Sequence, residues 1–517
     1  LERYRGNNSS SQRPSVAAAQ YRRGGKSMNS VDPRTPVLVG TGQLIQKPDN
    51  PVDALEPLAM MRVALEAAAD DAGARSLLDR ATDTWVVKGA WPYPDPAALL
   101  RDEFGNNSRT GISTDGGNTP QSLVNKASLR IQSGEADVVL IVGAEGIWSR
   151  RRARRAGERI PYTEQADVEP DEILGKDVTM SHPVELERGF AMPINFYPIF
   201  ESAFRASRGE SISDHRDRVS EMWETFNRVA CANPYSWVRN PMSAEEIRNP
   251  GPANRLVGFP YTKAMNSNWD LDQAAALIVC SAETAEAVGV ARDRWLFPQA
   301  GTDGSDTNFV SNRADLHSSP AIRVAGKKAM ELAGVQPGDI DHVDLYSCFP
   351  SAVQIAATEM ELGIDRQLTQ TGGLTFAGGP LNNYVTHSIA TMANVLREDA
   401  GTVGLCSANG GYITKHAFGL YSTTPPINGF QHEDCQKEID TYPTVELDAD
   451  HVGEATIEAY TVMHGAQGPE RGLASVRTPN GRQWAGTSDS QLMESMMNEE
   501  HVGRSVEILS DFTFELA

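Results

Sequence analysis

The chain has 517 residues, of which 40% are hydrophobic, and this is enough for two or three domains with cores of their own. Its formal net charge of −21 argues against nucleic acid or an anionic membrane surface as a partner, and no apolar run approaches the roughly 18–20 residues that a membrane span requires. The five cysteines include no Cys-x-x-Cys pair, which argues against a zinc site or a disulfide framework and favours a cytoplasmic location.

The first 33 residues differ in composition from the rest of the chain. Residues 1–29 carry six basic residues against one acidic residue and are rich in Ser, Asn, Gln and Gly. They contain no apolar core of the kind that a secretory signal has. We therefore expect residues 1–33 to be a disordered extension, and a native start at Met28 or a transit peptide would each account for the basic composition.

Residues 34–290 carry the pattern of an α/β half. Short apolar segments alternate with segments in which apolar residues recur at helical spacing. The pattern predicts strands over residues 36–40, 85–87 and 137–142 and helices over residues 51–72 and 123–132. All-apolar strands between helices are typical of a parallel sheet that is covered on both faces.

Residues 146–269 interrupt this alternation with a polar, proline-containing and aromatic sequence. We expect an insertion domain here, because long segments between the main layers of a fold often cover a binding site. Near its start stands a cluster of five arginines, Arg150, Arg151, Arg152, Arg154 and Arg155. The cluster could bind the phosphates of a nucleotide-like ligand or form a solvated helix face, and charged side chains are mostly exposed and solvated.

A repeat connects the two ends of the α/β region. Residues 123–145 and residues 389–411 both contain a helical stretch, a short break with glycine, and an apolar run that ends in small residues. A helix-to-strand unit that occurs twice implies a chain folded as two related α/β halves. The second half is expected over residues 291–425, before a linker with two prolines and an Asn-Gly pair.

Residues 431–517 have a different composition from the two halves. They contain 17 acidic residues against 5 basic ones, and apolar and polar residues alternate in several short stretches. The Asn480-Gly481 pair between two such stretches predicts a β-hairpin. We expect a small all-β barrel here, similar to an OB-fold.

Three short motifs follow one another in the second half: Tyr346-Ser347-Cys348-Phe349-Pro350, then Gly378-Gly379-Pro380-Leu381, then Cys406 with five small or turn-forming residues after it. In this order they resemble the catalytic motifs of the thiolase superfamily, most closely those of its sterol-carrier-protein type. Residues 272–275 are similar to a strand of the same family. The resemblance implies a thiolase-like fold of two βαβ halves in α/β/α/β/α layers, to which the C-terminal β domain is added. It also implies an acetyl-CoA acetyltransferase by homology, with coenzyme A or an acyl-CoA as a candidate ligand and no cofactor or metal.

The resemblance also shows which catalytic groups are missing. When Gly134 is aligned with the glycine that ends the family's nucleophile helix, the position of the nucleophilic cysteine falls on Gly117, and the position of the catalytic histidine falls on Gly379. A glycine can neither form a covalent intermediate nor transfer a proton. A hydroxyl of Thr119 or Ser122 could replace the thiol, although the sequence offers no evident base to activate it.

Tyr346 stands at the position of the family's asparagine or histidine, which holds an oxyanion water. Its hydroxyl could donate a hydrogen bond, or its ring could fill the space beside the small Gly379. Cys406 matches the family's acid/base cysteine, and a buried structural cysteine is the alternative. His387 is expected to be an ordinary helix histidine, and Cys348 matches a position that the family does not use in the chemistry.

We therefore predict a thiolase-like protein of acyl-CoA and lipid metabolism that lacks the standard thiolase activity, a pseudoenzyme. The alternatives are an enzyme that uses Cys406 and Tyr346 on a CoA thioester, and a non-catalytic acyl-CoA-binding or scaffold protein. The segment 109–117, through which thiolases dimerise, contains three glycines and an aspartate and predicts a weak strand. A weakened homodimer or a monomer is therefore expected.

Overall fold

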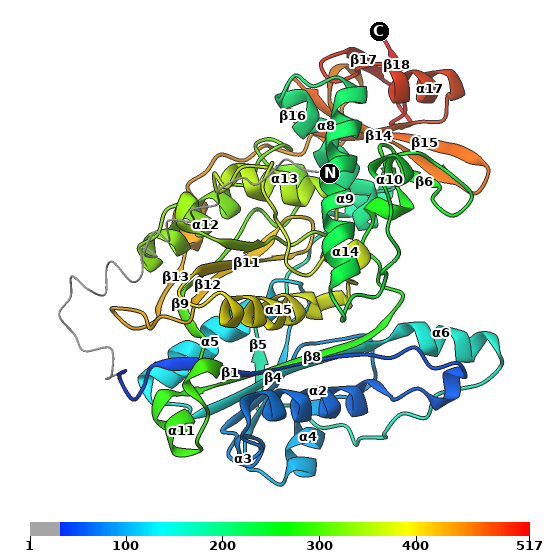
Figure 1. Cartoon of the computed structure of the whole chain (residues 1–517). Coiled ribbons are helices and arrows are strands. Elements are labelled where there is room, and N and C mark those ends of the chain that lie inside the picture. Colours follow the sequence, from blue (N-terminus) through cyan, green and yellow to red (C-terminus); the bar gives the residue numbers. More distant parts are fainter. Residues whose placement is uncertain (1–30) are drawn as a thin grey trace, which may run out of the picture.

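The computed structural model describes residues 31–517, so the predicted extension 1–33 lies almost wholly outside the described residues. Two α/β halves stack on each other, and a β domain lies at one end of the molecule (Figure 1). Among residues 31–517, no helix combines the length and the apolar composition that a bilayer crossing needs.

The first half is built on a six-stranded sheet in the order β1-β8-β4-β2-β3-β5. Its strands are β1 (Pro36–Ile45), β2 (Asp83–Val86), β3 (Arg109–Ser113), β4 (Val138–Gly146), β5 (Glu172–Leu174) and β8 (Asp272–Ser281). All three strands predicted for this half are present. Strand β4 is buried along its whole length, as expected of a strand whose sheet is covered on both faces.

The second half repeats this arrangement in a five-stranded sheet, β10-β11-β12-β9-β13. Its strands are β9 (Phe297–Ser305), β10 (His342–Asp344), β11 (Val403–Gly410), β12 (Lys415–Ser422) and β13 (Gln431–Asp434). In both sheets one parallel pair is followed by two antiparallel pairs, along β2-β4-β8-β1 in the first and β10-β11-β12-β9 in the second. This shared order confirms the two related halves.

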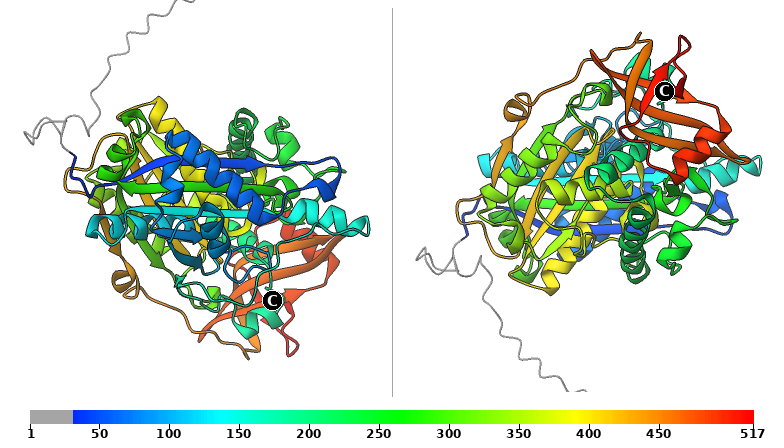
Figure 2. Two further views of the ribbon diagram at one scale, coloured as in Figure 1. Left: turned by 90° about the horizontal axis from the view of Figure 1, so that it is seen from below. Right: turned by 90° about the horizontal axis from the view of Figure 1, so that it is seen from above.

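Two helices form the middle layer between the sheets, α5 (Thr119–Ser133) and α15 (Tyr384–Glu398). They precede β4 and β11, so they are the repeated helix-to-strand units of the sequence. The outer helices are α2 (Pro57–Ala72), α3 (Ser76–Asp79), α4 (Pro96–Phe104) and α11 (Ala282–Ala287) in the first half and α12 (Pro320–Ala333) and α13 (Pro350–Glu359) in the second. Seen from below, α2 lies across the strands of the first sheet (Figure 2). The predicted α/β/α/β/α layering is confirmed.

The insertion contains the helices α6 (Ile147–Arg155), α7 (Pro183–Glu187), α8 (Pro193–Ser207), α9 (Ile212–Ala232) and α10 (Ala244–Arg248) and the short strands β6 (Leu256–Gly258) and β7 (Tyr261–Thr262). The helix α14 (Gly373–Phe376) of the second half packs against α9. Glu201 on α8 and His215 on α9 are both buried and hydrogen-bond to each other over 2.5 Å. This polar pair ties the two longest helices of the insertion together, because neither group could be left unpaired at low cost in the interior.

The C-terminal region forms the predicted β domain from β14 (Gly453–Gly465), β15 (Gly468–Thr478), β16 (Gly481–Thr487), β17 (Ser505–Ile508) and β18 (Phe514–Leu516), with the helix α17 (Ser490–Asn498). The short helix α16 (Gln436–Ile439) packs instead on β9 and α12 of the second half. The hairpin expected at Asn480-Gly481 joins β15 to β16. The strand order is β16-β15-β14-β17-β18, and a bridge between Gly486 and Thr513 connects its two ends. The sheet therefore closes into a small OB-like barrel.

The barrel is firmly docked on the rest of the chain. Strand β6 of the insertion pairs with β14, and Arg205 on α8 donates a hydrogen bond to Tyr460 Oη over 3.0 Å. The fully buried Arg482 on β16 donates to the carbonyl oxygens of Ser311 and Arg313 over 3.0 and 2.6 Å. From above, the barrel lies beside helices of the insertion (Figure 2). These contacts fix the loop after β9, which lines the cleft described below.

The expectation of a weak strand at residues 109–117 is wrong for its first five residues. They form β3, whose inner edge pairs with β2 and whose outer edge pairs in parallel with β5, in the register Gly111↔Glu172 and Ile112↔Ile173. The glycines at 116 and 117 lie beyond the strand, in the turn that leads into α5. A segment of the chain's own insertion therefore covers the edge of β3.

Candidate functional site

The turn before α5 is the place where the sequence predicts the missing nucleophile. The backbone N–H of Gly116 donates to Asn382 Oδ1 over 3.0 Å, and this contact holds the turn against the second half. A β-carbon at Gly117 would lie 2.4 Å from Tyr346 Oη and 2.5 Å from the carbonyl oxygen of Asn409. The space for a side chain at Gly117 is therefore filled by Tyr346. The prediction that Tyr346 fills the space beside Gly379 is wrong, because its hydroxyl lies beside Gly117 instead.

Gly379, at the predicted histidine position, is covered by a segment of the insertion. A β-carbon there would lie 2.4 Å from Ser267 Oγ and 3.3 Å from Leu374 Cδ2. The Gly379 N–H donates to the carbonyl oxygen of Asn268 over 2.8 Å, and the Ser267 N–H donates to that of Cys348 over 3.0 Å. The two backbone hydrogen bonds hold the insertion where a histidine side chain would begin.

The groups around Tyr346 are held in neutral form. Its N–H donates to Ser407 Oγ over 2.9 Å, and burial raises the pKa of its phenol. Burial also raises the pKa of the Cys348 thiol to about 12. Asn409 Nδ2 donates to Tyr197 Oη over 3.2 Å, while Asn409 Oδ1 has no partner within residues 31–517. A protonated thiol is a poor nucleophile, so this cluster does not replace the missing cysteine.

Cys406 lies in the interior of β11 and is fully buried. Burial raises the pKa of its thiol well above the ordinary value. Asn409 and Gly410 are the residues of β11 that meet the turn before α5, since the Asn409 carbonyl oxygen would lie 2.5 Å from a β-carbon on Gly117 and a β-carbon on Gly410 would lie 3.1 Å from Gly116 Cα. Asn409 is three positions along the strand from Cys406, which corresponds to about 10 Å. This placement favours the structural alternative over the catalytic assignment.

His387 lies on α15 beside a cavity of about 10 Å³, the size of one water molecule. Its Nδ1 is 2.8 Å from Gln43 Oε1, and its Nε2 has no partner within the described residues. Burial lowers the pKa of the imidazole to about 3, so the ring is uncharged at neutral pH. This is the environment of a buried helix histidine.

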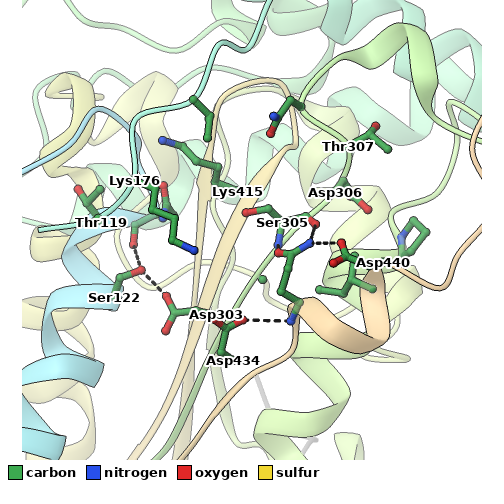
Figure 3. Close-up of a pocket in the computed structure, with 18 of the residues that line it drawn as sticks. Thr119, Ser122, Lys176, Asp303, Ser305, Asp306, Thr307, Lys415, Asp434 and Asp440 are labelled. Carbon is green, nitrogen blue, oxygen red and sulfur yellow. Dashed lines mark hydrogen bonds between the residues drawn. The ribbon is translucent and has the colours of Figure 1, made fainter.

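A cleft of about 780 Å³ opens beside the turn before α5 (Figure 3). It is lined from α5, from the segment after β5, from the loop after β9, from the start of β12 and from the segment that follows β13. Its lining side chains include Thr119, Ser122, Lys176, Asp303, Lys415 and Asp440. Both hydroxyls that the sequence offers as substitutes for the nucleophile therefore line this cleft.

Ser122 has a carboxylate partner that the sequence did not reveal. Its hydroxyl donates to Asp303 Oδ1, the contact drawn in Figure 3. Asp303 Oδ2 accepts from Asn125 Nδ2 over 3.0 Å and lies 2.9 Å from His432 Nε2. A hydroxyl, a base and an orienting group are the parts of an activated serine. Both oxygens of Asp303 are already engaged, however, by Ser122, Asn125 and His432.

Two buried charged groups line the cleft where the barrel fixes the loop after β9. Arg313 is 5% exposed and donates through Nη2 to the carbonyl oxygen of Tyr412 over 2.7 Å, while its Nε has no partner in the described structure. Asp306 accepts from the Ala321 N–H over 3.0 Å, and burial raises the pKa of its carboxyl group. Sequence reasoning missed these residues and Lys415, because no motif or spacing marks them.

The arginine cluster of α6 is used largely within the protein. Arg150 and Arg152 donate to backbone carbonyl oxygens, and Arg151 pairs with Asp270. None of the five arginines lines the cleft. Within residues 31–517, no three or more His, Cys, Asp or Glu side chains are grouped so that they could hold a metal ion.

Comparisons with known proteins place this geometry in context. A model described as the additional C-terminal domain of thiolase-like protein type 1 matches residues 434–513, and one described as thiolase C-terminal domain-like matches residues 302–364. An acetyl-CoA acetyltransferase of Methanocaldococcus jannaschii is 24% identical over 255 residues, which are 49% of this chain and 57% of that protein. Sterol carrier protein 2 of Oryctolagus cuniculus is 23% identical over 369 residues, 64% of this chain and 62% of that protein.

Among solved structures, a monomeric SCP2-thiolase-like protein type 1 from Mycobacterium smegmatis matches with a TM-score of 0.80 and 28% identity. The match covers 94% of this chain and all of that one. With the two curated relatives, by contrast, the chain spans less than two thirds of their length.

Proposed function

Because this chain is a thiolase-superfamily protein near the sterol-carrier-protein-type thiolases, we propose that it binds acyl-CoA-type ligands of lipid metabolism and does not carry out the thiolase reaction. The similarity to its relatives supports membership of a family of the acetyl-CoA acetyltransferase type. The loss of the reaction is our own inference from the site.

The observation that carries this proposal is the filling of two catalytic positions at once. The thiolase reaction needs a thiol that forms the acyl-enzyme and a histidine that supports it. Here both positions are glycines. A β-carbon at Gly117 would lie 2.4 Å from Tyr346 Oη, and a β-carbon at Gly379 would lie 2.4 Å from Ser267 Oγ. The two glycines do not leave a pocket into which a substrate group or another nucleophile could move.

The cleft beside the same turn is the proposed ligand site. Its volume of about 780 Å³ lies within the ~300–1,000 Å³ that is usual for small-molecule sites. Its lining includes Lys126, Lys176 and Arg313, and these side chains are the positive charge that a phosphorylated ligand would meet. Five aspartates, Asp303, Asp306, Asp315, Asp434 and Asp440, also line the cleft.

Two assays test the proposal. We expect no thiolysis of acetoacetyl-CoA by the purified protein, and we expect acetoacetyl-CoA to bind in a calorimetric titration. Lys176→Glu should weaken that binding several-fold, whereas Lys327→Glu, a matched charge reversal on the exposed face of α12, should leave it unchanged. Robust thiolysis would overturn the proposal. The absence of binding would favour a scaffold that recognises a protein partner instead.

We also propose that the protein is a monomer in a reducing, cytoplasmic compartment. The covered edge of β3 supports the first part, because β5 already takes the hydrogen bonds that a partner strand would need. The M. smegmatis structure is described as monomeric. All five cysteines lie within the described residues and are unpaired, and this supports a reducing compartment.

A further inference from the structure

Lys415 brings an amine to the turn before α5 from the start of β12. Its Nζ donates to the carbonyl oxygen of Asp115, and a β-carbon on Gly116 would lie 2.9 Å from this nitrogen. The side chain lines the cleft, and the residue is only 8% exposed. The amine is thus one residue away from the position at which the superfamily places its nucleophile, Gly117.

No carboxylate neutralises this amine at close range. Lys415 contacts the backbone of Asp115, but the carboxylate of Asp115 has other partners. Its Oδ2 pairs with Lys88 Nζ over 2.9 Å, and its Oδ1 accepts from Asn382 Nδ2 over 3.1 Å. Within residues 31–517, Lys415 has no acidic partner within 4.0 Å. Its hydrogen bond goes to a backbone carbonyl oxygen, which stabilises an ammonium less than a carboxylate does.

The surroundings favour the neutral amine. Burial lowers the pKa of Lys415, and the more distant carboxylates of Asp115 and Asp177 oppose this shift without cancelling it. The first turn of α5 lies at the same place, and the positive end of a helix dipole disfavours a further positive charge. A desolvated lysine that lacks a counter-ion and lines a cleft is the form in which lysine acts as a nucleophile towards carbonyl groups.

The other lysines of the cleft differ from Lys415 in these respects. Lys126 pairs with Glu172, and Lys176 is exposed to solvent. Neither is therefore a buried amine without a counter-ion. Lys176 provides an internal control, because it lines the same cleft.

We propose that Lys415 forms a reversible imine with the ketone group of a β-keto acid or of its thioester bound in the cleft. The nitrogen lone pair attacks the carbonyl carbon, and the two hydrogens of the amine leave with the carbonyl oxygen as water while the C=N bond forms. The inference rests on the proposed function in one respect, that the cleft receives a ligand. It does not require that the ligand carries coenzyme A.

Reductive trapping tests this assignment on the full chain. The protein is incubated at neutral pH with acetoacetate and sodium cyanoborohydride, whose hydride reduces the C=N bond to a stable amine, and the modified lysines are mapped by peptide mass spectrometry. We expect Lys415 to be alkylated at least about tenfold faster than Lys176, because only Lys415 is a buried amine without a counter-ion. Equal labelling of the two lysines, or none at Lys415, would overturn the proposal.

Variants and a second ligand separate this proposal from the proposed function. Lys415→Arg removes the amine and should abolish the adduct, whereas Lys327→Ala, on the exposed face of α12, should retain it. If Lys415→Arg does not fold, the adduct positions mapped on the protein without substitutions still test whether Lys415 forms the imine. Trapping of acetoacetate without binding of acetoacetyl-CoA would keep the imine site and remove the CoA ligand. Binding of acetoacetyl-CoA without any adduct at Lys415 would keep the ligand and overturn the imine.

Discussion

Replacing Gly117 with cysteine restores the thiol that the thiolase reaction uses, and we expect this variant to be inactive and less stable. The backbone at Gly117 is not in the left-handed region, so the conformation itself does not require glycine. The obstacle is space, because the new β-carbon would lie 2.4 Å from Tyr346 Oη, 2.8 Å from its Cζ and 2.5 Å from the carbonyl oxygen of Asn409.

The cost follows from how firmly these neighbours are held. The carbonyl belongs to the buried strand β11, and the Tyr346 backbone is tied to Ser407, so neither can move away freely. Inserting atoms into a well-packed core costs about 1–3 kcal/mol. Gly338→Cys is the matched control, since a β-carbon there meets nothing within 4 Å and φ is not positive.

Urea unfolding of both variants measures the difference, and thiolysis of acetoacetyl-CoA measures activity. We expect Gly117→Cys, but not Gly338→Cys, to lower the unfolding midpoint. We expect no turnover by either variant, because Gly379 supplies no histidine. Combining Gly117→Cys with Tyr346→Ala should destabilise by less than the sum of the two single changes, since the alanine removes the clash. Equal midpoints for the two cysteine variants would refute the steric argument, and turnover by Gly117→Cys would show that another base is already in place.

Three further predictions concern other parts of the molecule. Glu145 is 1% exposed, and burial raises its pKa from 4.5 to about 7. The folded state therefore binds a proton that the unfolded state releases, and stability should fall by about 3 kcal/mol as the pH rises from about 4.5 to about 7. Glu145→Gln, which keeps an oxygen for the Ala90 N–H, should remove this fall; an unaltered pH dependence of the urea midpoint would contradict it. Ile173→Pro should expose the edge of β3 and raise self-association in light scattering, and a stable dimer of the unmodified chain at low concentration would contradict the assigned role of β5. Gly379→Ala should displace Ser267 and lower the urea midpoint, whereas an unchanged midpoint would mean that the insertion yields there.

The fold could be predicted from sequence because its signals are local and repeated. The strands of the two sheets are short apolar runs, and the helix-to-strand unit at residues 123–145 recurs at residues 389–411. Strand β5 escaped prediction because it has three residues in a polar insertion. It is a strand only through its pairing with β3, and no sequence pattern reports such pairing.

Only those residues of the candidate site that lie in or near the ordered sequence motifs could be predicted. Gly117 and Gly379 were assigned to catalytic positions from the neighbouring motifs, and that assignment stays a prediction. Ser267, Asp303 and Lys415 could not be located, because each reaches the site from a segment more than a hundred residues away from α5 and follows no recognisable spacing. Their roles depend on tertiary contacts, which hydrophobic periodicity does not encode.

The filled space at Gly117 and Gly379 bears on what the protein can do. If Gly117 and Gly379 had left open space, a bound ligand or a single substitution could have restored part of the reaction. Instead, Tyr346 and Ser267 fill both positions, and each is held by backbone hydrogen bonds of its own segment. No space is left for a side chain at these two glycines, whereas Lys415 reaches the turn before α5 from the cleft. The proposed chemistry on a carbonyl compound therefore uses the cleft side of that turn.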